Sequence, residues 1–480
     1  MEEPVRRRVA VVGGGMAGLA AAYALTNARP DLDVIVFEGS GQVGGKLRLG
    51  EVAGVTVDLG AESMLNRRPE ATSLVRAVGL GDDLVHPVST QAGVWTRNAI
   101  RPLPPTMLGI PTDLAAAARS GVITPSQVRR AKLERWLPRL DVTADVGVGE
   151  VVARRLGRAV RDRLVEPLLG GVYAGRADEL SLHACLPQVT QALGDHGGLL
   201  SAVAALAPRP TAGAPSRRPA PGPVFAGIAG GVARLPHQLA HDLTHRGVDV
   251  RRNAVVRELV PMTGGRWRLV VGPSRSATVE HADAVVLACP AGAAARLLTK
   301  AVPVASRELG QVEYASMALV TLALETAELN AELVGSGLLV PPVDGRVIKA
   351  STFSSRKWSW LAGDTTIVRC SVGRHGDEAV LRRDDDELVA AAASDLREAV
   401  GLDSPLVDAL VTRWGGALPQ YAVGHLDRVS RVQAAASGVR GLELCGAVFE
   451  GVGIPAVIAS GQAAATRVLA ALDPAPTMTP

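Results

Sequence analysis

The sequence predicts an α/β protein that begins with a Rossmann-like nucleotide-binding domain. Two patterns near the N-terminus support this class. A strand runs through a glycine-rich turn into a helix over residues 8–25, and a second strand over residues 34–37 ends in an acidic residue. The chain has 480 residues, more than one hydrophobic core usually holds, so we expect two or three domains.

The first strand covers residues 8–12, and the helix that follows covers residues 19–25. The turn between them consists of Gly13, Gly14, Gly15, Met16, Ala17 and Gly18. In its GxGxxG spacing the first glycine allows the tight turn, the second lets the backbone approach a pyrophosphate, and the third lets the helix pack closely on the strand. Basic residues 6–8 before an apolar run also suggest an export signal, but the glycines split that run, so we reject this alternative.

The second strand ends in Glu38, twenty positions after Gly18. A carboxylate at this place can accept hydrogen bonds from a ribose diol, although an acidic residue at a strand end is often only solvated. Gly39 follows directly, and a second flexible turn with a cation comes at Gly45 and Lys46, which the minimal NAD pattern does not contain.

The composition excludes several classes of protein. At 47% hydrophobic and 20% charged residues it is typical of a soluble globular protein, and at 3% aromatic residues it does not favour base stacking. The net charge of +4 is spread without a dense basic block, so we expect no nucleic-acid partner. The four cysteines lie far apart, which predicts neither a metal site nor a disulfide framework and fits the cytoplasm. We expect no transmembrane segment, and peripheral membrane contact stays open.

These motifs resemble those of the flavoprotein superfamily that contains amine oxidases, phytoene desaturases and protoporphyrinogen-type oxidases. The resemblance rests on the glycine-rich turn, Glu38, "GGK" at 44–46 and "DLGAES" at 58–63. It implies FAD as the cofactor, held in a discontinuous FAD-binding domain of the GR2 type. The positions that it implies for cofactor contact, beyond those already named, are Gly60, Ala61, Glu62, Ser63, Val256, Trp414, Gly446, Val452, Gly453 and Ile454.

The C-terminal motif repeats the strand, glycine-rich loop and helix pattern over residues 442–461. By the resemblance, the backbone around Gly453 lies at the isoalloxazine or ribityl chain, and Val256 contacts the adenine through its backbone. The simpler interpretation of the C-terminal segment is a packing motif without a ligand. The simpler interpretation of Val256 is an ordinary core valine, and such a valine can still contact the adenine through its backbone.

Two further stretches are similar to porphyrinogen oxidases: "VEPLLGGVYAGRADELSLHACLPQV" at 165–189 and "RWGGALPQYAVGHLDRV" at 413–429. This similarity implies an FAD-dependent oxidase that converts coproporphyrinogen III to coproporphyrin III by three successive two-electron dehydrogenations. O2 is then the acceptor and H2O2 the second product, in haem biosynthesis. The alternatives are a protoporphyrinogen IX oxidase, another flavin amine or carotenoid oxidase, and a non-catalytic flavoprotein partner.

The propionates of such a substrate need cations, and Arg67 and Arg68 are the candidates, unless they are only solvated surface residues. The arginine that anchors a propionate in mitochondrial relatives has no counterpart, because its place falls near Ala92. Gly171 and Tyr173 are pocket candidates, and we favour a packing role for Tyr173. The catalytic residues are unknown because the chemistry centres on the flavin. As a further partner we leave open a transient contact of this chain with the next enzyme of the haem pathway.

Three units follow along the chain. The FAD-binding domain is expected to combine residues 1–86, 207–296 and 439–480. A helical insertion covers residues 94–206, and a mixed β-sheet that binds the substrate covers residues 297–438. The Pro/Ala-rich stretch 207–223 is expected to be an exposed, poorly ordered loop.

Overall fold

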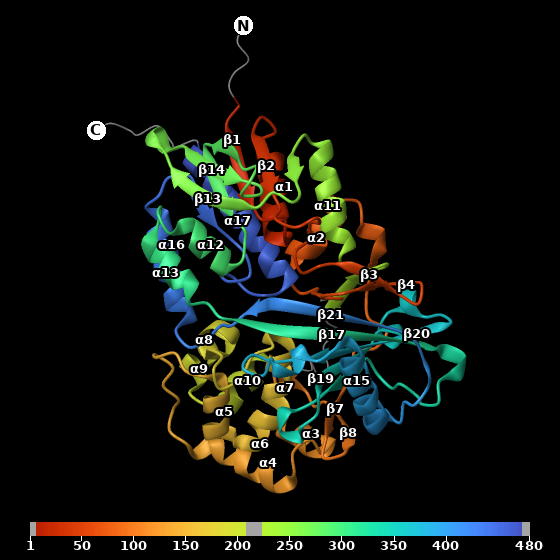
Figure 1. Ribbon diagram of the computed structural model, residues 1–480. Coiled ribbons are helices and arrows are strands. Elements are labelled where there is room, and N and C mark those ends of the chain that lie inside the picture. The colour runs from red at the N-terminus through yellow and green to blue at the C-terminus, as the bar shows by residue number, and fades with distance from the viewer. Residues whose placement is uncertain (1–5, 208–222, 473–480) are drawn as a thin grey trace, which may run out of the picture.

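The computed structural model describes residues 6–207 and 223–472 and has the predicted α/β class. Two large sheets dominate it (Figure 1). One is a five-stranded nucleotide sheet, and the other is a seven-stranded sheet whose long strands cross the middle of the molecule. The predicted loop at 207–223 lies almost wholly outside the described residues.

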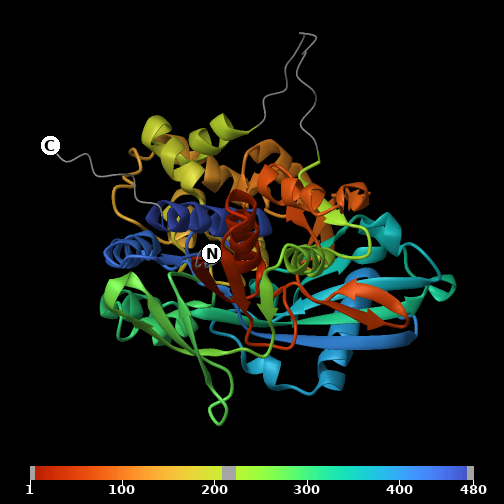
Figure 2. The same ribbon diagram turned by 90° about the horizontal axis from the view of Figure 1, so that it is seen from above.

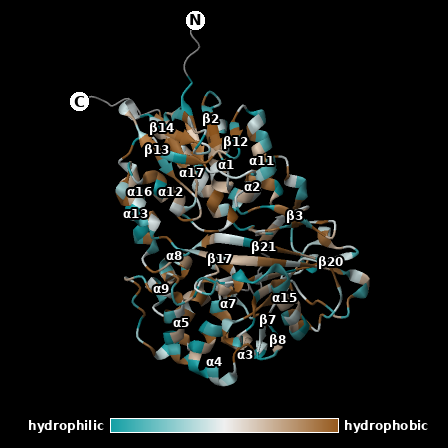
Figure 3. Cartoon of the chain, in the orientation of Figure 1, coloured by the Kyte–Doolittle hydropathy of each residue, from teal (hydrophilic) through white to brown (hydrophobic). Residues whose placement is uncertain are grey.

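The nucleotide sheet is parallel throughout, with strand order β12-β2-β1-β16-β22. Its strands are β1 (Arg8–Val12), β2 (Asp33–Phe37), β12 (Asp249–Arg251), β16 (Ala284–Leu287) and β22 (Leu442–Leu444). Parallel strands buried on both faces are expected to be almost continuously apolar, and "VAVV" and "AVVL" in β1 and β16 are fully buried. The hydropathy colouring shows the same concentration of apolar residues around β1 and β2 (Figure 3).

Helices cover both faces of this sheet. α1 (Met16–Ala28), α11 (Arg234–His245) and α17 (Ile454–Leu472) pack on one face, where Val9 and Val11 point. On the other face lie α12 (Ala291–Leu298), α13 (Pro303–Gly310), α16 (His425–Ser437) and an antiparallel sheet of β13 (Val256–Pro261), β14 (Trp267–Val271) and β15 (Thr278–Ala282). The view from above separates the small sheet from α1 and α17 (Figure 2).

The seven-stranded sheet has the order β21-β17-β20-β19-β18-β7-β8. Its strands are β7 (Ala92–Thr96), β8 (Ala99–Pro102), β17 (Tyr314–Glu325), β18 (Gly337–Leu339), β19 (Ile348–Phe353), β20 (Thr365–Val372) and β21 (Leu406–Pro419). α15 (Asp385–Val400) packs on one face of it through a cluster that includes Leu388, Ala392 and Leu396. The expected mixed sheet is therefore present: β18 and β7 are parallel and the other pairs are antiparallel.

A helical layer lies beside this sheet. It contains α3 (Leu114–Ser120), α4 (Pro125–Lys132), α5 (Val148–Leu156), α6 (Arg158–Val160), α7 (Glu166–Tyr173), α8 (Leu182–Cys185), α9 (Pro187–His196) and α10 (Leu199–Leu206). One apolar cluster, which includes Leu164, Leu169 and Leu199, holds these helices together.

The remaining strands and α-helices are short. They are the strands β3 (Leu49–Val52), β4 (Val55–Asp58), β5 (Met64–Leu65), β6 (Leu84–Val85), β9 (Thr106–Met107), β10 (Ile110–Pro111) and β11 (Phe225–Ile228), with helices α2 (Pro69–Ala77) and α14 (Ser354–Lys357).

The packing differs from the predicted domain limits in two places. The segment 94–206 is not wholly helical, because most of β7 and all of β8 lie in it and pair with each other at the edge of the seven-stranded sheet. The segments 303–310 and 425–437 form α13 and α16, which pack on the nucleotide sheet although we assigned them to the substrate sheet. In both cases buried apolar faces, rather than position along the chain, decide where an element packs. The other domain limits stay predictions.

Candidate functional site

The glycine-rich turn joins β1 to α1 as predicted, but α1 begins at Met16 instead of residue 19, so Gly18 lies in the first turn of the helix. Gly13 has a φ of +114°, and an added Cβ there would lie 2.7 Å from the carbonyl oxygen of Ala288 on β16's end. A Cβ on Gly18 would lie 1.9 Å from the carbonyl oxygen of Gly13, so this glycine lets the helix approach the turn. A Cβ on Gly15 meets nothing within 4 Å. Open space beside a helix N-terminus fits the diphosphate of a dinucleotide.

Glu38 follows β2 and lies beside this turn. Its Oε2 accepts a hydrogen bond of 2.8 Å from the amide of Gly14, and its Oε1 accepts one of 2.8 Å from the amide of Ser40. These bonds fix the carboxylate at the carboxyl end of the sheet. Glu38 is thus half-buried and tied to the glycine-rich turn, and its contact with a ribose stays a prediction.

Two further predicted segments meet the same edge. Gly44 donates a 2.8 Å hydrogen bond to the carbonyl of Gly14, and a Cβ on Gly45 would approach Gly15 to 3.4 Å. The amide of Ala254, two residues before Val256, donates to the carbonyl of Glu38 at 2.8 Å. Segments around residues 14, 38, 44 and 254 thus adjoin one another.

The cation Lys46 reaches β21 of the seven-stranded sheet. Its Nζ donates a 3.0 Å hydrogen bond to the carbonyl of Gly416, and burial lowers its pKa to about 8. Trp414, on the same strand as Gly416, donates from its indole nitrogen to the carbonyl of Leu59 at 2.7 Å. A Cβ on Gly60 would lie 2.1 Å from the carbonyl oxygen of Lys46, so the backbone segments at 46 and 60 touch.

Glu62 forms a buried charge cluster that the sequence reasoning missed. Its carboxylate accepts from Lys357 Nζ at 2.7 Å, from Arg369 at 2.8 Å and from the Ser354 hydroxyl at 3.0 Å. Burial alone would raise the pKa of Glu62, but the charges of Lys357 and Arg369 outweigh it and hold that pKa at about 2. Arg369 also donates to the carbonyl of Gly60 at 2.6 Å. The only signal in the sequence was "FSSRKW" at 353–358, an unusual group of polar residues after a strand.

Ala61 and Ser63 flank this cluster: Ala61 is exposed and Ser63 is half-buried. Asp58, which closes β4, was also missed as a structural residue. Its carboxylate accepts from the amides of Val232 and Ala233 at 2.9 and 3.0 Å, and so fixes the turn that leads into α11.

The C-terminal motif forms β22, a loop and α17. Gly446 in the loop has a φ of +123°, and its amide donates to the Ser460 hydroxyl at 3.1 Å. A Cβ on Gly461 would lie 2.1 Å from the carbonyl oxygen of Ala17, so α17 packs closely against the start of α1. Residues 452–454 lie at the N-terminus of α17. Among the described helices α17 alone is long and apolar enough to cross a membrane, but half of it is buried inside the protein.

The substrate candidates have different surroundings. Arg68 pairs with Glu70 at 2.7 Å, whereas the exposed side chain of Arg67 contacts no charged group among the described residues. Tyr173 is buried and its ring packs 5.4 Å from that of Tyr421. Gly171 is exposed, and a Cβ there meets nothing within 4 Å.

The comparison with known proteins agrees with this geometry. The family described as flavin containing amine oxidoreductase matches residues 16–469, which is most of the chain. The chain belongs to the flavin containing amine oxidoreductase family. As a member it is an FAD-dependent oxidoreductase, and the prediction of FAD as cofactor is confirmed.

Several members of this family are similar over almost their full length. A coproporphyrinogen III oxidase of Mycobacterium tuberculosis is 36% identical over 477 residues, which cover 97% of this chain and 98% of that protein. A coproporphyrinogen III oxidase of Bacillus subtilis is 30% identical, with 97% and 98% covered. A crystal structure of a candidate protoporphyrinogen oxidase from Exiguobacterium sp. 255-15 has a TM-score of 0.83 at 30% identity, with 96% and 98% covered.

Proposed function

We propose that this chain oxidises coproporphyrinogen III to coproporphyrin III with O2 as the acceptor. The observation that carries the proposal is the similarity over 97% of the chain to bacterial proteins named coproporphyrinogen III oxidase. The "GVYAG" segment at 171–175 and the "RW…PQY…GH" segment at 413–425 are similar to porphyrinogen oxidases and so support a porphyrinogen as the substrate. The related name protoporphyrinogen oxidase makes protoporphyrinogen IX the second candidate substrate.

The overall reaction removes six electrons and six protons, that is six hydrogen atoms, from the macrocycle in three rounds. Each round converts one O2 into one H2O2, so three molecules of O2 balance one porphyrin. When bound, FAD would supply the acceptor for two electrons from a methylene bridge and would pass them on to O2. The contribution of the protein is then to hold the macrocycle in place and to exclude competing reactions.

Within a discontinuous FAD-binding domain of the GR2 type, the residues predicted for the cofactor have separate tasks. The turn at 13–18 and the N-terminus of α17 at 452–454 direct backbone amides toward negative charge. Glu38 would hold the ribose, and the backbone near Val256 would hold the adenine. The backbone at 60–63 and at 446, with Lys46 and Trp414, would border the remaining length of the cofactor.

On the substrate side, Arg67 is the stronger candidate for a propionate. Its guanidinium has no carboxylate beside it among the described residues, while Glu70 already neutralises Arg68. The exposed Gly171 leaves room for a flat ligand, whereas Tyr173 serves the packing of the helical layer. We place this activity in the cytoplasm.

The decisive experiment compares two substrates on the FAD-loaded enzyme. Coproporphyrinogen III and protoporphyrinogen IX are prepared anaerobically, and porphyrin fluorescence is followed after O2 is admitted. We expect a larger kcat/KM for coproporphyrinogen III. A larger kcat/KM for protoporphyrinogen IX would make that compound the better-supported substrate. If FAD-loaded enzyme oxidised neither compound, both proposals would be refuted.

A further inference from the structure

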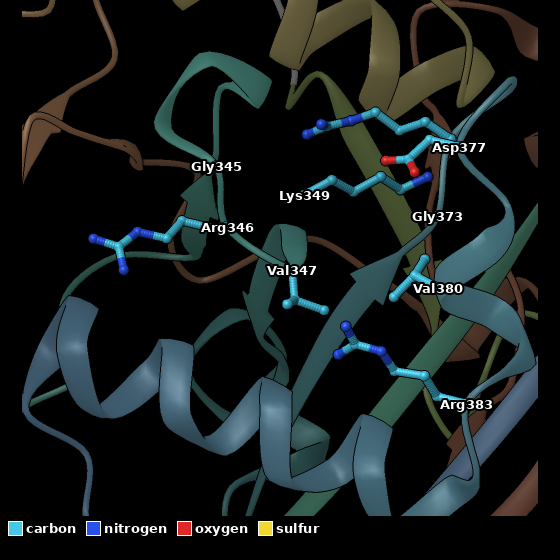
Figure 4. Close-up of a pocket in the computed structure, with 9 residues that line it drawn as sticks. Gly345, Arg346, Val347, Lys349, Gly373, Asp377, Val380 and Arg383 are labelled. Carbon is cyan, nitrogen blue, oxygen red and sulfur yellow. The ribbon is translucent and has the colours of Figure 1, made fainter.

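A basic cavity lies away from the cofactor residues, where β19 begins and β20 ends. It has a volume of about 190 Å³ (Figure 4). Its lining includes Val347 and Val380, which also pack against the cluster beneath α15. On β20, Arg369 points to Glu62, while the alternate residues Cys370 and Val372 join the α15 cluster. The cavity therefore opens on the face of the sheet opposite to the Glu62 cluster.

Lys349 is the unusual residue of this cavity. It sits at an irregularity between β19 and β20, where the register shifts between Ile348 and Ala350. Only 5% of its surface is exposed. Across residues 6–207 and 223–472, no hydrogen bond or ion pair joins its ammonium group to another residue. The ammonium nitrogen itself is not fully buried and keeps contact with the open space of the cavity, where its charge is only partly solvated and an anion could meet it.

Three arginines surround the same space. Arg374 is half-buried, and one of its nitrogens donates to the carbonyl of Val340 at 3.0 Å. Arg383 is exposed, and its guanidinium has no partner within the described part of the chain. Arg346 points away from the cavity in Figure 4 and pairs with Glu398.

One carboxylate, that of Asp377, is part of the lining, and it is exposed. Arg346 aside, the lining thus carries two more positive than negative charges. The positive groups are the Lys349 ammonium and the guanidinium groups of Arg374 and Arg383.

We propose that this cavity binds a small oxyanion, either inorganic phosphate or the carboxylate end of a larger molecule, between Lys349, Arg374 and Arg383. Its size admits such a group but not a porphyrin macrocycle. Guanidinium groups and an ammonium group together suit tetrahedral and planar oxyanions.

The electrostatics of Lys349 support the site. Burial, and next the charge of Arg374, lower its pKa to about 7. The fold itself therefore supplies no counter-charge that would keep the ammonium form, and a bound anion would supply one. Burial also lowers the pKa of the half-buried Arg374, although the charges of Glu166 and Asp377 act in the opposite direction.

The test uses the FAD-saturated enzyme, so that added phosphate does not compete for the cofactor's own site. Sodium phosphate and sodium propionate are titrated in separate arms against sodium chloride of equal ionic strength, with Tm and calorimetric Kd as readouts. We expect a saturable rise of Tm in at least one arm, and the arm identifies the kind of oxyanion. Lys349→Met should raise Kd at least about tenfold.

Lys349→Met should also leave Tm unchanged or higher without anion, because it removes a buried charge that has no partner. If this variant fails to fold, Arg383→Gln carries the test. It should weaken binding, whereas its exposed neighbour Arg382→Gln, which does not line the cavity, should not. The absence of a saturable shift in both arms would overturn the proposal, and so would equal shifts in Arg383→Gln and the wild type. Neither outcome bears on the proposed oxidase activity.

Discussion

The carboxylate of Glu62 lies 2.8 Å from the guanidinium of Arg369, although 307 positions separate them in the sequence. Both side chains are largely buried, with 12% and 6% of their surfaces exposed. The pair connects the segment after β4 to β20, and Arg369 reaches on to the carbonyl of Gly60. A cluster of this kind fixes the backbone around Gly60, which we propose borders the FAD.

Glu62→Gln should destabilise the protein strongly. The change leaves Lys357 and Arg369 as buried charges without a counter-ion, and loss of one member of a buried pair costs about 3–5 kcal/mol. The free energy of unfolding of the FAD-free protein in urea measures this. Glu51→Gln, at an exposed glutamate of β3, is the matched control and should change stability by less than about 0.5 kcal/mol. If both substitutions changed the free energy of unfolding equally, the Glu62 cluster would contribute no more to stability than an exposed glutamate does.

Gly15, which caps α1, and Gly18, which lies in its first turn, should respond differently to alanine. Gly18→Ala places a methyl group where only 1.9 Å separates the Cβ from the Gly13 carbonyl oxygen, so the FAD-free protein itself should be destabilised. Gly15 has a φ of −75° and open space around its Cβ position, so Gly15→Ala should leave that stability within about 0.5 kcal/mol.

FAD binding separates these two effects. Since Gly15 borders the space proposed for the diphosphate, Gly15→Ala should weaken FAD binding at least about tenfold in a flavin fluorescence titration. If Gly15→Ala bound FAD as tightly as the wild type, the diphosphate would have to lie elsewhere.

The sequence predicted the nucleotide sheet well because its information is local. β1 and β2 were expected at 8–12 and 34–37 and occur at Arg8–Val12 and Asp33–Phe37. The pattern of apolar side chains and the glycine-rich turns are each set within a few residues of sequence. The prediction of FAD depends on such short motifs. The partners of Glu62 could not be found this way, because its ion pairs depend on how the segment after β4 meets β20 and α14. The packing of α13 and α16 escaped prediction for the same reason.

Arg67 and Arg68 should differ in their effect on substrate binding. Arg67→Ala should raise the KM for coproporphyrinogen III about tenfold and leave kcat within about twofold, as expected when a contact equal in ground and transition states is lost. Arg68→Ala should change KM much less, because Glu70 already engages that guanidinium. Steady-state kinetics on both FAD-loaded variants measures this, and an unchanged KM in Arg67→Ala removes it from the substrate site.

Asp58 should make stability fall as the pH rises from about 4 to about 6. Burial raises the pKa of this carboxyl to about 6, although two backbone amides oppose the shift. The folded chain therefore holds a proton that the unfolded chain, with an ordinary value of 3.8, has released. The stabilisation is complete below about pH 4 and is lost as the pH passes 6.

A shift of this size corresponds to about 3 kcal/mol. Asp58→Asn cannot ionise, so the free energy of unfolding should lose this part of its pH dependence in urea titrations between pH 4 and 7. Asp364→Asn, at an exposed aspartate, should retain the slope of the wild type. Should Asp58→Asn keep that slope as well, the proton would have to be held by another group, and the carboxylate of Asp58 would be ionised over the whole range.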